Sequence, residues 1–257
     1  MTTCKNCANS FEGNYCPNCS QKAETHRFTL KHFAHDFFHA FTHADKGIFF
    51  LGKELFIRPG KVAREFNEGK RKKYFNPITY LLLVLALQVY LANLSGINTF
   101  YADRIYEMNQ SKEVAANSAE FHKIMEVWNT VQRKMYEHGK LVNITLIPIL
   151  SFFVWLMYRK SESNYAEVLV MNVMYTGQAL LIFILMCILP FVLYKDSILI
   201  TTNLYMLTSV VFMAVLLKQF YQQSWWKTIL KTIVAQLLYY IVVFLLMAAV
   251  TVAVLLQ

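Results

Sequence analysis

The sequence has few charged residues. Asp, Glu, Lys and Arg make up 16% of its 257 residues, whereas 56% of the residues are hydrophobic. A typical soluble domain carries about 25% charged residues. The mean hydropathy of +0.34 agrees with this composition. An ordinary soluble domain is therefore excluded, and the composition indicates a chain that buries much of its surface in lipid.

Catalytic motifs and intramembrane charges are also missing. The chain has no H-E-x-x-H motif, no glycine-rich phosphate loop and no paired carboxylates within its apolar runs. Ionisable groups inside a membrane usually mark transport or proton pathways. Their scarcity argues against a proton-coupled or ion-coupled transporter. Asn172 and Gln178 are amides within an apolar run, and we expect them to form hydrogen bonds between helices.

Five apolar runs follow Pro77. A membrane-spanning helix needs about 20 predominantly apolar residues, so the sequence predicts an all-α polytopic membrane protein with about five transmembrane helices in residues 78–257. The predicted spans are 78–94, 141–158, 168–194, 198–217 and 229–256. Residues 95–140 carry apolar residues at mostly helical spacing, which predicts an extracytoplasmic helical segment.

Lys and Arg residues indicate the orientation of these spans. They concentrate before the first span and in the loops after the second and the fourth, and such residues are retained on the cytoplasmic side. No signal peptide is expected, because the first long apolar run begins only after Pro77. We therefore expect a cytoplasmic N-terminus and an extracytoplasmic C-terminus.

Four of the five cysteines form two C-x-x-C pairs near the N-terminus: Cys4, Cys7, Cys16 and Cys19. Four thiolates complete a tetrahedron around zinc, so residues 1–24 are predicted to be a zinc ribbon that holds one structural Zn²⁺. Phe11 is expected to act as a small apolar plug, and Gly13-Asn14 to form a hairpin turn.

Two disulfides, a redox pair and an iron–sulfur cluster are the alternatives to zinc at these cysteines. A cytoplasmic location argues against two disulfides. A thioredoxin-like redox pair needs a surrounding βαβ pattern, which so short a segment does not provide. An iron–sulfur cluster usually has different spacing, although four thiolates do not exclude one.

Residues 25–77 are predicted to form cytoplasmic amphipathic helices and a basic collar. From Phe28 to His43 the helical pattern gathers aromatic residues on one face and polar groups on the other. The polar face is a candidate second metal site or a pH-sensing face, and it is also consistent with solvated side chains alone. Its residues are His32, His35, Asp36, His39 and His43.

The basic collar precedes the first span. Residues 47–57 are predicted to be a second helix or a re-entrant segment, ended by the turn signal Arg58-Pro59-Gly60. The collar residues are expected to contact anionic lipid headgroups or nucleic acid, or to serve only as an orientation signal. They are Arg58, Lys61, Arg64, Lys70, Arg71, Lys72 and Lys73.

Several short motifs in the first ninety residues carry a family resemblance. They are the four cysteines with Gln21, Arg58-Pro59-Gly60, Arg64-Glu65-Phe66, Gly69-Lys70-Arg71 and Tyr74-Phe75-Asn76-Pro77. With these motifs the chain resembles an uncharacterised family of bacterial membrane proteins, which joins an N-terminal zinc ribbon to several spans. The resemblance implies a location in the bacterial inner membrane and brings no activity. Typical ribbons carry glycine where this chain has Ala8 and Ser20.

Three functions fit these features. The first is a non-enzymatic membrane-anchored adaptor or regulator, whose ribbon and collar bind a cytoplasmic protein or nucleic acid. The second is an oligomeric pore or membrane effector, for example in bacterial defence, which requires a homo-oligomer. The third is a metal-dependent enzyme that acts on lipid through the histidine face; histidines alone do not specify a reaction.

Overall fold

The computed structural model describes residues 1–25, 27, 29–30, 47–100, 103–104, 107, 124, 126–131 and 139–255, with only the backbone described for 139–143. The described part is mostly helical, as predicted. It begins with a small four-cysteine module (residues 1–24). Strands β1 (Thr2–Thr3) and β2 (Ser10–Phe11) of this module pair antiparallel, with Thr2 opposite Phe11.

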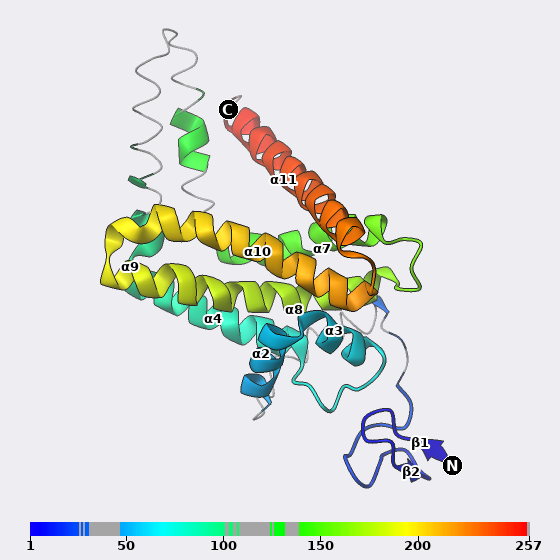
Figure 1. Cartoon of the computed structure of the whole chain (residues 1–257). Coiled ribbons are helices and arrows are strands. Elements are labelled where there is room, and N and C mark those ends of the chain that lie inside the picture. The colour runs from blue at the N-terminus through cyan, green and yellow to red at the C-terminus, as the bar shows by residue number, and fades with distance from the viewer. Residues whose placement is uncertain are drawn as a thin grey trace.

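A helical hairpin follows the module in the described chain. It consists of α2 (Ile48–Ile57) and α3 (Pro59–Asn67), with Arg58 between them (Figure 1). Pro59 starts α3 because its ring fixes a helical φ and the missing amide is not needed at the first helical position. The expected helix over residues 47–57 is therefore present as α2.

Five longer helical stretches form the bundle. They are α4 (Pro77–Ser95), α7 (Gly139–Met157), α8 (Tyr165–Phe183) continued by η2 (Ile184–Ile188) and α9 (Leu189–Leu193), α10 (Ile198–Tyr221) preceded by η3 (Lys195–Ser197), and α11 (Trp225–Leu255). Within the described residues, four stretches are long and apolar enough to cross a membrane, while α7 counts as a shorter apolar helix over Ile144–Met157. A mostly helical chain with four candidate membrane-spanning helices among its described residues is confirmed, and the exact number of spans stays a prediction.

Local signals set the helix ends. The Asn76 side chain accepts hydrogen bonds from the amides of Ile78 and Thr79, which caps the start of α4. Asn164 and Glu167 form a reciprocal capping box at the start of α8. Gly96 ends α4 in a left-handed conformation with φ of 70°.

Helix α8 is the centre of the bundle and packs against α4, α7, α3 and α10. A Cβ atom added at Gly177 would lie 2.8 Å from the Tyr80 ring, so glycine lets α4 approach α8 closely. The Tyr80 hydroxyl donates to Gln178 Oε1 at 2.6 Å, and Asn172 Nδ2 donates to Ser151 Oγ at 3.0 Å. The expected hydrogen bonds of Asn172 and Gln178 between helices are thus confirmed.

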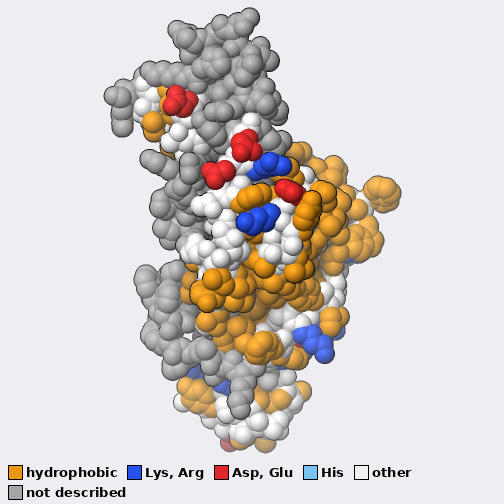
Figure 2. Space-filling view, turned by 90° about the vertical axis from the view of Figure 1, so that its left-hand side faces the viewer, with side chains coloured by type: hydrophobic (Ala, Val, Ile, Leu, Met, Phe, Trp, Pro, Cys, Tyr) orange, Lys and Arg blue, Asp and Glu red, His pale blue; other side chains and the backbone are white. Residues whose placement is uncertain are grey.

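The helix ends sort into two groups. The starts of α4, α8 and α11 and the ends of α7 and α10 lie toward the four-cysteine module, and we call them the module-side ends (Figure 1). The opposite end of the bundle carries the α9 turn. Figure 2 views the molecule from that end and shows apolar side chains over much of the described surface, with one group of charged side chains above the centre and a few others near the top and lower down. This distribution suits a bundle surrounded by lipid.

Candidate metal centre and the basic segment beside it

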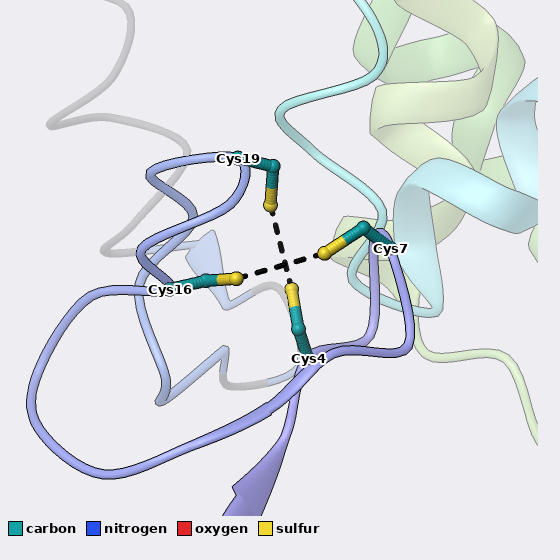
Figure 3. Close-up of side chains that lie close together, drawn as sticks. All are labelled: Cys4, Cys7, Cys16 and Cys19. Carbon is teal, nitrogen blue, oxygen red and sulfur yellow. Dashed lines mark hydrogen bonds between the residues drawn. The ribbon is translucent and has the colours of Figure 1, made fainter.

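The four cysteines predicted to bind one metal ion come together in the four-cysteine module. The sulfurs of Cys4, Cys7, Cys16 and Cys19 lie within 4.8 Å of one another and point to a common centre (Figure 3). The Sγ atoms of Cys4 and Cys19 are 3.5 Å apart, and those of Cys7 and Cys16 are 3.6 Å apart. All four are free thiols. Four cysteines in this arrangement are close enough to bind a metal ion.

Two similar backbone turns position the thiols. The amide of Ala8 donates to the Cys4 carbonyl, and the amide of Ser20 donates to the Cys16 carbonyl. Ala8 and Ser20 both adopt left-handed backbone, with φ of 60° and 58°. Glycine is the usual residue in this conformation. The turns therefore form here without it, and the side chain of Phe11 is buried beside Cys4 and Cys16.

Backbone amides prepare part of this site for thiolates. Burial alone would raise the pKa of the Cys4 thiol, but hydrogen bonds from the amides of Cys7 and Asn6 outweigh it and lower that pKa. The Asn9 amide lowers the pKa of Cys7. For Cys19 the Gln21 amide lowers the pKa, yet burial and the nearby sulfurs of Cys4 and Cys7 raise it to about 11. A bound cation would relieve this repulsion, and thiolates favour soft metals such as zinc.

The four-cysteine module is attached to the basic segment that precedes α4. Gln21 is buried, and its Oε1 accepts a hydrogen bond from the Lys72 amide at 3.2 Å. Beside this contact, Gly69 adopts a φ of 108°, and a Cβ atom there would lie 2.8 Å from Thr25 Oγ1. Lys5 Nζ donates to the Thr25 carbonyl at 3.1 Å. The close approach at Gly69 thus joins the end of the module to the turn after α3.

A buried carboxylate organises the basic segment. Glu65 is 7% exposed, and it accepts hydrogen bonds from Lys73 Nζ at 2.8 Å and from the Tyr74 hydroxyl at 2.6 Å. Lys70 Nζ lies 3.5 Å from its other oxygen. Burial alone would raise the pKa of the Glu65 carboxyl, but these hydrogen bonds and positive charges lower it to about 2. Glu65 therefore stays ionised and fixes the two lysines.

The seven collar residues consequently differ in their surroundings. Arg58 pairs with Glu54 one turn earlier, and Arg64 lies 3.6 Å from Glu68 one turn later. Lys61 and Lys72 are exposed and form no salt bridge with another described residue. Arg71 is half-buried. Much of the collar charge is therefore balanced within the chain, while the predicted contact with lipid or nucleic acid stays a prediction.

One further ion pair was not anticipated from the sequence. The guanidinium of Arg27 donates to both carboxylate oxygens of Glu167 at 2.8 and 2.9 Å and also reaches the Glu162 carbonyl. The hydrogen bond to Glu167 raises the pKa of Arg27. Nothing in the local pattern of either residue signals this contact, because the two lie 140 positions apart. It connects the segment after the four-cysteine module to the start of α8.

The predicted histidine face lies outside the described residues. His32, His35, Asp36, His39 and His43 all fall in residues 31–46. The hypothesis of a second metal site or a pH-sensing face stays a prediction. Among the described residues, the four cysteines are the set of potential metal ligands that the structure brings together.

Comparison with known families agrees with the resemblance already noted. The family DUF3667, described as proteins of unknown function, matches residues 45–89. This stretch contains α2, α3, the basic segment and most of α4, including Glu65 and Tyr80. Searches of curated proteins and of solved structures found no match to the chain.

Proposed function

We propose that the chain is a membrane-anchored adaptor or regulator without enzymatic activity. The observation that carries this proposal is the four-cysteine set, because the four thiols fill every position of a tetrahedral metal and leave none for a substrate. The ion is a structural Zn²⁺, and the module is a zinc ribbon. Its role is to hold a recognition surface in place.

The proposal places the four-cysteine module in the cytoplasm of a bacterium, at the inner membrane. The Lys and Arg residues around the module-side helix ends support this orientation, since such residues are retained on the cytoplasmic side. They include Arg159 and Lys160 between α7 and α8, and Lys227 in the first turn of α11. The location in the inner membrane rests on the family resemblance.

The expected partner is a cytoplasmic protein with an acidic surface, which would contact the exposed lysines of the four-cysteine module and the collar. Lys22, Lys61 and Lys72 are exposed and form no salt bridge with another described residue. Tyr15 is 57% exposed, and it pairs with Lys22 through an isolated β-bridge. Tyrosine is enriched in the centres of protein interfaces. Anionic lipid headgroups next to the bundle are the expected partners of Lys61, and a nucleic acid is the alternative partner of the same lysines.

A site-specific photo-crosslinker tests the adaptor proposal. Benzoylphenylalanine is placed at Lys22 of the full chain in bacterial cells, and the same crosslinker in a Cys16→Ala background is the matched control. We expect one discrete protein adduct that disappears in the control, followed by saturable binding of that purified protein. In parallel, the purified chain in nanodiscs of neutral lipid is titrated with a labelled single-stranded RNA and a labelled DNA duplex. Absence of both an adduct and nucleic-acid binding at low salt would sink the proposal.

A second candidate, an oligomeric pore or effector, is favoured by the exposure of α11. Only 6% of the most apolar window of this helix is buried, and large side chains such as Leu237 and Phe244 are more than half exposed. Such a helix faces either lipid or a second copy of the chain. The mass of the detergent-solubilised protein, measured by light scattering with the detergent subtracted, decides between a monomer and an oligomer. A monomer would remove this candidate.

A further inference from the structure

A cavity of about 260 Å³ lies between α7, α8, α10 and α11. It is partly open, and Tyr240, which is 48% exposed, belongs to its lining. Its polar lining includes the side chains of Tyr175, Tyr205, Ser209, Gln236, Tyr239 and Tyr240. None of the described residues that line it is Asp, Glu, Lys, Arg or His. A ligand of this cavity is therefore neutral.

The cavity lies deep within the bundle. Its lining residues on α8, Tyr175 to Leu180, begin ten positions after the start of that helix at Tyr165. Those on α11, Gln236 to Tyr240, begin eleven positions after Trp225. At 1.5 Å per residue both sets lie roughly 15–22 Å from the module-side ends, near the middle of a hydrocarbon core about 30 Å thick. Charged phospholipid headgroups do not reach this depth.

Several polar groups in the cavity form no hydrogen bond with another residue in the described part of the chain. Gln236 is 8% exposed, and its amide forms no hydrogen bond with any described residue. The hydroxyls of Tyr205, Tyr239 and Tyr240 likewise form none within the described part of the chain. By contrast, Tyr175 donates to the Ser209 carbonyl at 3.3 Å. A polar group without a partner is unfavourable in lipid, so a hydrogen-bonding ligand would satisfy Gln236 and the tyrosine hydroxyls that line the cavity.

We propose that this cavity binds the ring of a neutral, prenylated quinone dissolved in the membrane. The amide of Gln236 and the tyrosine hydroxyls offer N–H and O–H donors, which match the carbonyl oxygens of such a ring. The tyrosine faces suit a flat ring. Pockets for whole drug-sized ligands measure about 300–1,000 Å³, so this smaller cavity holds the ring alone, and the prenyl tail leaves through the opening into the lipid.

The test is direct binding to the full-length chain in nanodiscs. A benzoquinone with a decyl tail is titrated by calorimetry with empty nanodiscs subtracted, and decylbenzene is the control ligand without carbonyls. We expect saturable one-site binding of the quinone only. Gln236→Leu combined with Tyr239→Phe should weaken binding at least tenfold, and Tyr205→Phe alone should weaken it about threefold. Gln88→Leu, which changes a glutamine of α4 outside the cavity, should leave the affinity unchanged.

The variants also report on folding. Since Gln236 forms no hydrogen bond with a described residue, Gln236→Leu should raise the unfolding temperature of the ligand-free protein while removing the rise that the quinone gives the wild type. The proposal is overturned by quinone affinity that is equal in the wild type and the double variant, by equal binding of decylbenzene, or by no saturable binding. None of these outcomes depends on the adaptor proposal, because the cysteines and the basic segment are unchanged.

Discussion

The four-cysteine module and the helical bundle are stabilised in different ways. In the module, Cys4, Phe11 and Cys16 are the buried apolar residues, and two of them are potential metal ligands. The bundle has a continuous apolar core that runs from α2 to α11 and includes close helix contacts at Gly60 and Gly177. We therefore expect the module to depend on metal coordination by its cysteines, whereas the bundle depends on packing. Separate treatments should unfold one and leave the other.

Removal of the metal should have the largest effect. In the Cys16→Ala variant, or in wild type with a strong chelator, we expect the module to unfold while the bundle keeps its helical circular dichroism. Structural zinc supplies about 10–16 kcal/mol in small fingers. Elemental analysis should find one zinc per chain in the wild type and none in the variant. One metal retained in Cys16→Ala, or no metal in the wild type, would contradict the ribbon.

Gly60→Ala should damage the bundle and spare the module. A Cβ atom at Gly60 would lie 2.1 Å from the Leu216 carbonyl oxygen of α10, and the Gly60 amide donates to Gln219 Oε1 at 3.1 Å. Separating α3 from α10 should cost about 3 kcal/mol, the upper end of overpacking. Gly52→Ala is the matched control, since its Cβ would meet the Tyr80 hydroxyl at an ordinary 3.5 Å. Unfolding temperatures that fall equally in both variants would refute this contact.

Glu65→Gln should have a smaller effect that depends on pH. The folded-state pKa of about 2 lies below the ordinary value of 4.5. The ionised carboxylate therefore stabilises the fold above pH 4.5, by about 3 kcal/mol at most, and this contribution is lost as the pH falls toward 2. The unfolding temperature of Glu65→Gln should be lower at pH 7 and should change less between pH 5 and 3 than that of the wild type. Glu68→Gln, at an exposed pair, should behave as wild type.

Gln21→Ala should have the smallest effect, on the contact between the two regions. Loss of the hydrogen bond from the Lys72 amide should cost about 1 kcal/mol. We expect faster hydrogen exchange at residues 69–73, with zinc content and bundle stability unchanged. Lys22→Ala, at an exposed neighbour, is the control. Unchanged exchange at these residues would show that Gln21 does not hold the module in place.

Features with short sequence spacing were predictable. The grouping of the four thiols was predicted correctly, because each C-x-x-C pair is formed by one local turn. The positions of the long helices were also predicted, because a membrane-spanning helix needs a long run of apolar residues. The amides of Asn172 and Gln178 were assigned correctly as hydrogen-bonding groups between helices, since an unpaired amide is costly in a membrane.

The ion pairs that the collar residues form within the chain were harder to predict from the sequence. The sequence pattern treats Arg58 to Lys73 as one basic surface, although Glu54 precedes Arg58 by four residues, a spacing that favours a helical ion pair. Glu65 belonged to a recognised motif without an assigned role, because only the fold shows that it is buried between Lys73 and Tyr74. Gly60 was expected to mark a turn, whereas its main role is close contact with α10.

The pair of Arg27 and Glu167 also constrains the order of assembly during synthesis. The two residues are 140 positions apart, and ribosomes add roughly 5–20 residues per second. The N-terminal module thus leaves the ribosome at least about seven seconds before its anchor on α8 exists. During that interval the module is tethered to a nascent chain that still lacks Glu167, so early folding of the module does not depend on this ion pair.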